Sequence, residues 1–288
     1  MRLARFRTSD GTTAFGVVED GAIARLDHRI ASFDQLLAGP VAPEPGDPRV
    51  LRDEVTWEPP LGDQAKILCV GFNYGAHASE SGRDTPSAPT LFVRFPDSFV
   101  GAGTPVVRPA GEESLDWEGE VGLVIGKPGR RIPADEAWQH IAGFTCVAEN
   151  SVRDWQQHST QATAGKNWAG TGAVGPWLST VDGVGTDPLR LVTRLNGEIV
   201  QDDTTDHLVF PFGRLVSYIS TFTPLRPGDL IATGTPSGVG VRRNPPRFLR
   251  PGDELEVEVS GVGVLRHGVA DEARHGIGVP GASVEAGR

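Results

Sequence analysis

The sequence predicts a mainly β protein of the α+β class, with helices only at its periphery. Apolar runs are short, and turn-forming residues such as Gly, Pro, Asn and Asp separate them at close intervals. Apolar residues at helical spacing occur in only a few places. A chain of 288 residues can form one large domain or two unequal ones.

Residues 1–62 are expected to form a small, β-rich N-terminal domain. Strand-like runs at 3–6, 13–18 and 22–26 are separated by turn signals at Asp10-Gly11 and Asp20-Gly21. A Pro-rich segment at 41–48 and the Pro-Pro-Leu-Gly stretch at 59–62 then indicate a domain boundary. We expect residues 63–274 to form a larger β-rich domain and the Gly-rich residues 275–288 to be a disordered tail.

Short apolar runs in the second domain predict strands at 67–70, 90–93, 121–125, 189–195, 230–233 and 255–259. Helices are predicted at 134–141 and at 212–222, where Leu215, Tyr218, Ile219 and Phe222 follow helical spacing. The phrase Leu-Arg-Pro-Gly-Asp occurs at 225–229 and at 249–253, each time before a predicted strand. Pro and Gly suit the two centre positions of a type II turn, so both copies are interpreted as turns.

The composition excludes several classes of protein. With a formal net charge of -10, the chain lacks the basic surface that nucleic acid or anionic lipid would need. No apolar run approaches the ~20 residues of a bilayer span, and no apolar segment follows the basic N-terminus as in a signal peptide. We therefore expect a cytoplasmic protein. Cys69 and Cys146 have apolar or small neighbours, which predicts buried free thiols.

An acidic cluster precedes the apolar run at 121–125. In an extended chain Asp116, Glu118 and Glu120 would lie on one face of a strand. A solvated face is one interpretation, and the acids at 254, 256 and 258, which alternate with apolar residues, show that pattern. The run at 121–125 differs because it has no polar position, which indicates a strand covered on both faces.

Acids gathered in a partly dry site must bind protons or a cation. Side chains two positions apart on one strand face lie ~6.6 Å apart. Two negative charges at that separation repel by roughly 2.5 kcal/mol at an effective dielectric constant of about 20. An all-carboxylate set favours Mg²⁺, Mn²⁺ or Ca²⁺ over zinc, so we expect a site for a hard divalent ion.

A second polar pair follows the predicted strand at 67–70. If the segment from Gly75 is helical, His77 and Glu80 are i, i+3 neighbours, and the carboxylate can orient the imidazole as a general base. The alternative is a surface helix that carries two polar residues. Arg153 and Lys166 also have a plain interpretation, as solvated surface charges.

Taken in order, motifs between residues 66 and 272 resemble those of the fumarylacetoacetate hydrolase family. They are Asn-Tyr-x-x-His-x-x-Glu, Asp-x-Glu-x-Glu, Ser-Val-Arg-Asp-x-Gln, Gly-Lys, Gly-Pro-Trp, Asn-Gly-Glu, Pro-Gly-Asp and Thr-Gly-Thr-Pro-x-Gly-Val-Gly. The resemblance implies a mostly β catalytic domain in a homodimer that binds Mg²⁺, or else Mn²⁺ or Ca²⁺. It also implies action on small 2-oxo or 1,3-dicarbonyl acids.

The resemblance further implies roles for individual residues. The metal ligands would be Glu118, Glu120 and Glu149. The general-base pair of a mobile lid would be His77 with Glu80, and the leaving or enolate oxygen would be assisted by Lys166. Contacts to the substrate would come from Tyr74, Arg153, Gln156 and Thr235.

Two departures from the family pattern affect the site. The third ligand is commonly Asp, whereas Glu149 is one methylene longer. The usual phrase Phe-Leu-Lys-Pro-Pro-Ser is replaced here by Phe-Val-Arg-Phe-Pro-Asp at 92–97, which changes the expected pocket wall.

The reaction implied by the resemblance is hydrolysis of a C–C bond in an acylpyruvate- or fumarylacetoacetate-type acid, through a metal-stabilised enolate. The same enolate would serve a decarboxylase of oxaloacetate-like acids. It would also serve an isomerase or hydratase of hydroxymuconate-type acids in aromatic catabolism. A non-catalytic family member that keeps the fold is the remaining alternative.

Overall fold

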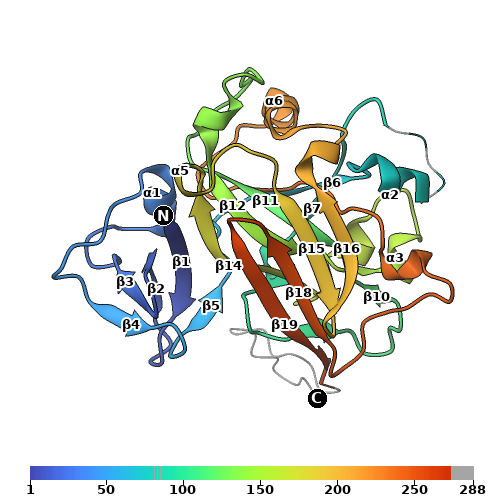
Figure 1. Cartoon of the computed structure of the whole chain (residues 1–288), viewed down its shortest axis with the longest axis horizontal. Helices are drawn as coiled ribbons and strands as arrows, with labels where there is room; N and C mark the ends of the chain where they lie inside the picture. Colours follow the sequence, from blue (N-terminus) through green and yellow to red (C-terminus); the bar gives the residue numbers. More distant parts are fainter. Residues whose placement is uncertain (81, 83, 85, 274–288) are drawn as a thin grey trace, which may run out of the picture.

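A computed structural model of the chain describes residues 1–80, 82, 84 and 86–273. Within them, strands form the core and helices are short and peripheral, as the sequence predicts (Figure 1). The tail expected at 275–288 lies outside the described residues. No helix in the described part of the chain has the length and apolar character of a membrane span.

The N-terminal region consists of five strands and one helix. These elements are β1 (Arg2–Arg7), β2 (Thr13–Val18), β3 (Ala22–Arg25), α1 (Phe33–Ala38), β4 (Arg49–Leu51) and β5 (Thr56–Glu58). The predicted strands at 3–6, 13–18 and 22–26 are confirmed to within two residues at their ends. Helix α1 begins after Ser32, whose hydroxyl accepts a hydrogen bond from the Gln35 amide.

The N-terminal strands continue into the main sheet of the second region. This sheet has 12 strands in the order β4-β3-β2-β1-β14-β12-β11-β17-β6-β7, with β5 paired to β1 and β8 paired to β14. The two regions join where β1 lies antiparallel to β14, with Leu3 opposite Leu178. A domain boundary near residue 62 stays a prediction, since hydrogen bonding between strands crosses from one region to the other.

The remaining strands of the main sheet are β6 (Ile67–Gly71), β7 (Thr90–Arg94), β8 (Phe99–Val100), β11 (Gly119–Ile125), β12 (Ile141–Ala148), β14 (Gly172–Thr180) and β17 (Leu230–Ala232). Every residue of β11 is buried, which confirms that the apolar run at 121–125 is covered on both faces. A smaller two-stranded sheet pairs β10 (Leu115–Asp116) with β13 (Ser151–Val152).

A five-stranded sheet in the order β16-β15-β18-β19-β9 packs against the main sheet at β11, β12 and β14 (Figure 1). Its strands are β9 (Val106–Arg108), β15 (Arg190–Leu195), β16 (Glu198–Thr204), β18 (Glu254–Val259) and β19 (Gly263–Asp271). In β18 the apolar residues are buried while the acids at 254, 256 and 258 are exposed or half-buried. The predicted wet face of that strand is therefore confirmed.

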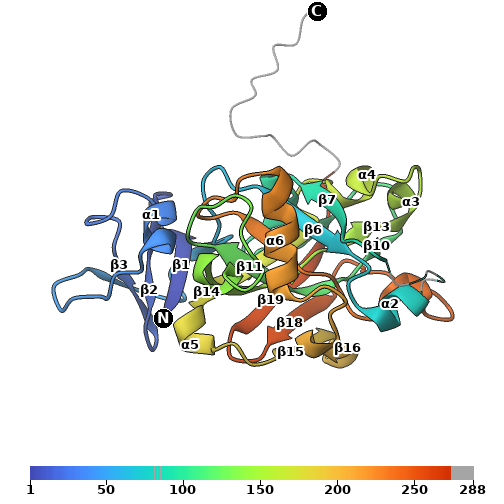
Figure 2. The same cartoon turned by 90° about the horizontal axis from the view of Figure 1, so that it is seen from above.

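Short helices surround the sheets. They are α2 (Gly75–Glu80), α3 (Arg153–Gln156), α4 (Thr163–Lys166), α5 (Val181–Val184) and α6 (Phe212–Phe222), with 3-10 turns at Pro96–Ser98, Ala137–His140, Thr205–His207 and Gly240–Arg242. Helix α6 has the predicted bounds and buries Leu215 and Ile219, although Phe222 is exposed. Figure 2 shows α2, α3 and α4 gathered at the end of the molecule opposite β2 and β3.

The helix predicted at 134–141 is wrong. Only a 3-10 turn, Ala137–His140, forms there, and Ile141 already begins β12. The helix-like spacing of apolar residues arises because Trp138 packs edge-on against Phe144 and Phe212, which anchors the turn to α6. Both cysteines are free and buried, as predicted.

Candidate active site and metal centre

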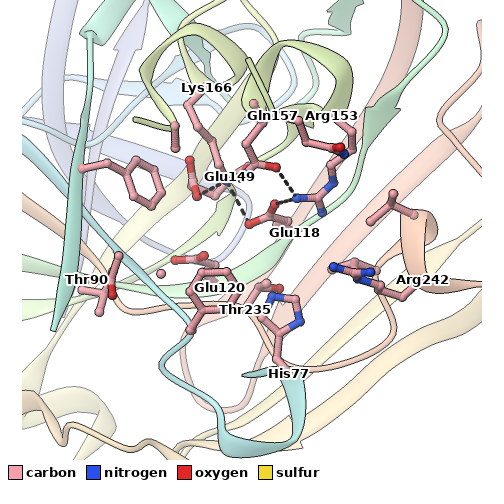
Figure 3. Close-up of a pocket in the computed structure, with 18 of the residues that line it drawn as sticks. His77, Thr90, Glu118, Glu120, Glu149, Arg153, Gln157, Lys166, Thr235 and Arg242 are labelled. Carbon is pink, nitrogen blue, oxygen red and sulfur yellow. Dashed lines mark hydrogen bonds and ion pairs between the residues drawn. The ribbon is translucent and has the colours of Figure 1, made fainter. Parts of the chain in front are cut away.

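A cavity of about 760 Å³ opens at the end of the molecule where α2, α3 and α4 gather (Figure 3). Its wall contains most of the residues that the sequence singles out: His77, Glu118, Glu120, Glu149, Arg153, Gln156, Lys166 and Thr235. They come from segments that lie far apart in the chain, so the fold brings the predicted site together.

Strand pairing explains how the acids meet. Glu120 lies in β11, Glu118 lies just before that strand, and Glu149 follows β12 directly. These strands are antiparallel with Gly119 opposite Ala148, and the Glu149 amide donates to the Glu118 carbonyl at 2.8 Å. Glu149 therefore lies beside Glu118 although about thirty residues separate them in the chain.

The sequence interpretation of one strand face carrying three acids is wrong in one respect. Asp116 belongs to β10 in a separate small sheet, and Trp117 and Glu118 form the link to β11. The carboxylate of Asp116 accepts hydrogen bonds from Arg153 Nε and from the amides of Gly240 and Val241. Asp116 thus anchors other parts of the site and is not a member of the metal-binding group.

One carboxylate oxygen from each of Glu118, Glu120 and Glu149 lies within 4.8 Å of the other two. All three side chains are buried. Lys166 is buried with them, and its ammonium group donates to Glu118 Oε2 at 2.9 Å, to Glu149 Oε2 at 2.5 Å and to the Glu149 carbonyl at 3.0 Å. All three N–H bonds of Lys166 therefore have acceptors within the protein.

Two arginines supply further positive charge around the acids. Arg153 Nη1 lies 2.7 Å from Glu118 Oε1 and also donates to Gln156 Oε1 at 2.8 Å. Arg94 is buried and donates through Nη1 to Glu149 Oε1 at 3.1 Å. Arg153 Nη2 is buried and has no hydrogen-bond partner among the described residues.

The pKa values of the three acids diverge because their neighbours differ. Burial favours the neutral form of Glu118, but the charges of Lys166 and Arg153 outweigh it and hold its pKa at about 2. Burial, together with the charges of Glu149 and Glu118, raises the pKa of Glu120 well above its usual range. Burial also raises the pKa of Glu149 despite Lys166 and Arg94. Of the three carboxylates, Glu120 is therefore the one whose negative charge is least compensated by neighbouring positive charges.

These residues fit a hard divalent ion. The three donors are carboxylates, which Mg²⁺, Mn²⁺ and Ca²⁺ prefer. Each carboxylate oxygen can accept more than one bond, so the contacts to Lys166, Arg153 and Arg94 leave acceptor capacity toward the cavity. An ion beside Glu120 would also relieve the repulsion that raises the pKa of this side chain.

His77 and Glu80 lie in α2, as predicted, with His77 Nδ1 3.4 Å from Glu80 Oε2. Phe72 stacks on the imidazole with ring centres 5.8 Å apart. Burial raises the pKa of Glu80, but the hydrogen bonds from His77 and the Gly238 amide outweigh it and lower the pKa overall. Glu80 thus links α2 to the Thr-Gly-Thr-Pro-Ser-Gly loop and orients the imidazole toward the cavity.

The predicted substrate contacts are distributed unevenly. Thr235 lines the cavity, but its hydroxyl already donates to the Gly119 carbonyl and accepts from Gln201. Gln156 lines it and holds Arg153 in place. Tyr74 is fully buried within the main hydrophobic core and is absent from the cavity wall. The structure therefore does not bring Tyr74 together with the other predicted residues.

Sequence reasoning missed two residues that the site contains. Arg94 belongs to the segment 92–97 that departs from the family phrase, and its contact with Glu149 depends on the pairing of distant strands. Arg242 lines the cavity from the 3-10 turn Gly240–Arg242. The sequence signal for Arg242 is its position two residues after the motif Thr-Gly-Thr-Pro-x-Gly-Val-Gly, which ends at Gly240.

Comparison with known proteins defines the family. The family model for the fumarylacetoacetate hydrolase C-terminal domain matches residues 66–270, and a model described as Rv2993c-like, N-terminal matches residues 1–60. The chain belongs to the fumarylacetoacetate hydrolase family, whose characterised members are enzymes. The chain is 42% identical over 222 residues to the human protein named oxaloacetate tautomerase FAHD2A, mitochondrial, with 76% of this chain and 70% of that protein covered.

Solved structures of related proteins share the fold. The 5-carboxymethyl-2-hydroxymuconate delta-isomerase of Mycobacterium smegmatis matches with a TM-score of 0.79 and 31% identity, covering 94% of this chain and all (100%) of that one. The fumarylacetoacetate hydrolase of Exiguobacterium antarcticum matches with a TM-score of 0.83 and 30% identity, again covering 94% and 100%. The names of these relatives span tautomerase, isomerase and hydrolase activities.

Proposed function

We propose that this protein is a metal-dependent enzyme that interconverts the keto and enol forms of an oxaloacetate-type 2-oxo acid. The observation that carries the proposal is the buried group of Glu118, Glu120 and Glu149 beside Lys166, in a cavity that also holds a histidine. Such a group can gather a divalent cation, and negative charge that develops on a substrate oxygen is then offset where water is excluded. The name of the human relative agrees with this reaction.

The residues that would hold the ion are Glu118, Glu120 and Glu149, with Mg²⁺ as the expected ion and Mn²⁺ or Ca²⁺ as alternatives. When bound, the ion supplies Lewis-acid stabilisation of enolate charge. Lys166 and Arg94 hold the Glu149 carboxylate from two sides and fix its direction. All three N–H groups of Lys166 already donate to Glu118 and Glu149, so Lys166 neutralises and positions these acids. It would contact the substrate only by giving up one of these hydrogen bonds.

Binding of the 2-oxo carboxylate is assigned to Arg153. Its Nη2 group is buried without a partner among the described residues, while Asp116, Glu118 and Gln156 fix the rest of the guanidinium. A donor held in this way is oriented before the substrate arrives, which reduces the entropy lost on binding. Gln156 and Thr235 would contribute shape and polarity near this carboxylate.

Proton transfer is assigned to His77. Because Nδ1 faces Glu80, the other ring nitrogen, Nε2, remains available to the substrate. In one direction Nε2 accepts the proton at C3 of the keto acid, and in the other it returns that proton. Solvent supplies or accepts the proton on the enol oxygen.

Hydrolysis of a C–C bond is the second candidate. The His77–Glu80 pair could equally deprotonate a water molecule, and the relative from Exiguobacterium antarcticum is named a fumarylacetoacetate hydrolase. Decarboxylation and double-bond isomerisation use the same enolate, and the Mycobacterium smegmatis relative is named an isomerase. A homodimer in the cytoplasm stays a prediction, which size-exclusion chromatography can test for the oligomeric state.

The test compares the candidate reactions on one preparation. Enolic oxaloacetate is diluted into buffer with protein and Mg²⁺ or Mn²⁺, and decay of the enol ultraviolet band is followed. Acylpyruvates and a hydroxymuconate-type acid are assayed in parallel. We expect accelerated enol decay that a chelator abolishes. A metal-loaded protein that leaves the enol decay at the solvent rate would refute the tautomerase proposal, and acylpyruvate turnover would then favour hydrolysis.

A further inference from the structure

Three cationic side chains line the cavity within the described part of the chain: Arg153, Lys166 and Arg242. The first two make ion pairs with buried acids. Arg242 is exposed, and its side chain makes no hydrogen bond or ion pair with any described residue. The cavity thus presents one guanidinium whose charge the protein leaves available.

The backbone that carries Arg242 is fixed. Asp116 accepts hydrogen bonds from the amides of Gly240 at 2.7 Å and Val241 at 3.0 Å, and the Arg247 amide donates to the Gly240 carbonyl at 3.1 Å. A Cβ atom at Gly240 would lie 1.9 Å from the Arg247 carbonyl oxygen, so the close approach requires glycine. The fully buried Asp116, which also holds Arg153, therefore positions both arginines.

In the view of Figure 3, Arg242 lies on the opposite side of the cavity from Glu149 and Lys166, and His77 projects from below between the two sides. On the proposed function, the 2-oxo carboxylate binds beside the acids and Arg153, and Figure 3 shows Arg153 between Glu118 and Arg242. The remainder of the substrate then extends from Arg153 toward Arg242.

We propose that Arg242 binds the distal carboxylate of the oxaloacetate-type substrate and so determines the preference for 2-oxo dicarboxylates over 2-oxo acids with a single carboxylate. The assignment rests on the proposed function, because that function sets the direction in which the substrate lies. A guanidinium binds a carboxylate through two parallel hydrogen bonds, which gives geometric selection as well as charge attraction. A substrate that ends in a methyl group would gain neither.

The charge of Arg242 also acts on Glu80. The hydrogen bonds from His77 and the Gly238 amide lower the pKa of Glu80, and the positive charge of Arg242 adds a smaller contribution in the same direction. That influence does not occupy Arg242, because the Glu80 carboxylate bonds to His77 and to the Gly238 amide. The guanidinium can therefore approach a ligand while it still favours the ionised form of Glu80.

The test uses two four-carbon acids that differ only at the far end, oxaloacetate and 2-oxobutyrate. Exchange of the C3 protons for deuterium is followed by NMR, with the solvent rate subtracted, so that both acids report the same proton transfer. We expect Arg242→Ala to raise KM for oxaloacetate by about 10- to 100-fold. The kcat for oxaloacetate and both constants for 2-oxobutyrate should change less than about threefold. Arg242→Lys should be intermediate, since an ammonium group is a point charge.

Arg214→Ala is the matched control, because Arg214 is an exposed arginine on α6 that is absent from the cavity wall.

Calorimetry with oxalate, which lacks the distal carboxylate-bearing part of oxaloacetate, tests binding beside the acids and Arg153. If oxalate binds the Mg²⁺-loaded protein but Arg242→Ala leaves the preference for oxaloacetate over 2-oxobutyrate unchanged, the assignment of Arg242 is wrong and the proposed function stands. If oxalate does not bind, and neither acid is exchanged, both proposals fail.

Discussion

Replacing Arg94 by Met is expected to destabilise the metal-free protein strongly. Arg94 is buried and donates hydrogen bonds to Ser98, Glu149, Asn150 and Thr171. Methionine can fill much of the same volume, but among the described residues it leaves the buried Glu149 with only Lys166 as a charged partner. Removal of one partner from a buried ion pair costs about 3–5 kcal/mol, because the remaining charge loses its compensation.

The assay is urea denaturation in the presence of a chelator, with Glu149→Gln and the double variant measured beside Arg94→Met. If the cost arises from the uncompensated carboxylate, Glu149→Gln should restore part of the stability of Arg94→Met. The coupling free energy between the two sites should then be about 1–3 kcal/mol. Mg²⁺ should also reduce the loss, since an ion beside Glu149 supplies positive charge.

Arg214→Met serves as the control, since a substitution at an exposed position should change stability by less than about 0.5 kcal/mol. A loss below about 1 kcal/mol for Arg94→Met, or additive effects of the two substitutions, would falsify the view that Arg94 compensates Glu149.

Three further predictions concern the site and the core. Glu120→Gln should lose Mg²⁺ binding in calorimetry together with turnover, whereas His77→Ala should keep the ion and lose at least about tenfold in kcat; equal metal loss in both would argue against separate roles. Gly240→Ala should raise KM for oxaloacetate as Arg242→Ala does, because a Cβ there displaces the turn that carries the arginine; an unchanged KM would contradict this. Burial lowers the pKa of His267 to about 4, from 6.5. Its contribution to stability, roughly 3 kcal/mol, should therefore be present above pH 6.5 and lost as the pH falls toward 4; His267→Leu should flatten that part of the urea-midpoint profile.

The sequence predicted the strands best where apolar runs are continuous. The run at 121–125 predicted both a strand and the burial of its two faces, because a strand with one solvated face carries polar residues at alternate positions. The helix predicted at 134–141 failed because aromatic packing onto α6, a contact between distant segments, produces the same spacing. Local periodicity does not distinguish these two causes.

The acids of the site were predicted from the family motifs, and their meeting follows from the pairing of β11 with β12. The sequence does not reveal which charged side chains form ion pairs or hydrogen bonds with one another. The contact of Arg94 with Glu149 and the hold of Asp116 on Arg153 and Gly240 join segments that lie 37 to 124 residues apart. No spacing rule within one segment reports such contacts.

The pairing of β1 with β14 has a consequence for how the chain folds. Leu3 is opposite Leu178, so the ribosome must synthesise most of the chain before β1 can form hydrogen bonds with β14. Until then the N-terminal strands present an open edge that can pair with another nascent chain. Such distant pairing also predicts slow folding. A chain truncated to start near residue 63 would expose the corresponding edge of β14, so its aggregation would report the missing partner strand and not a defect in the catalytic region.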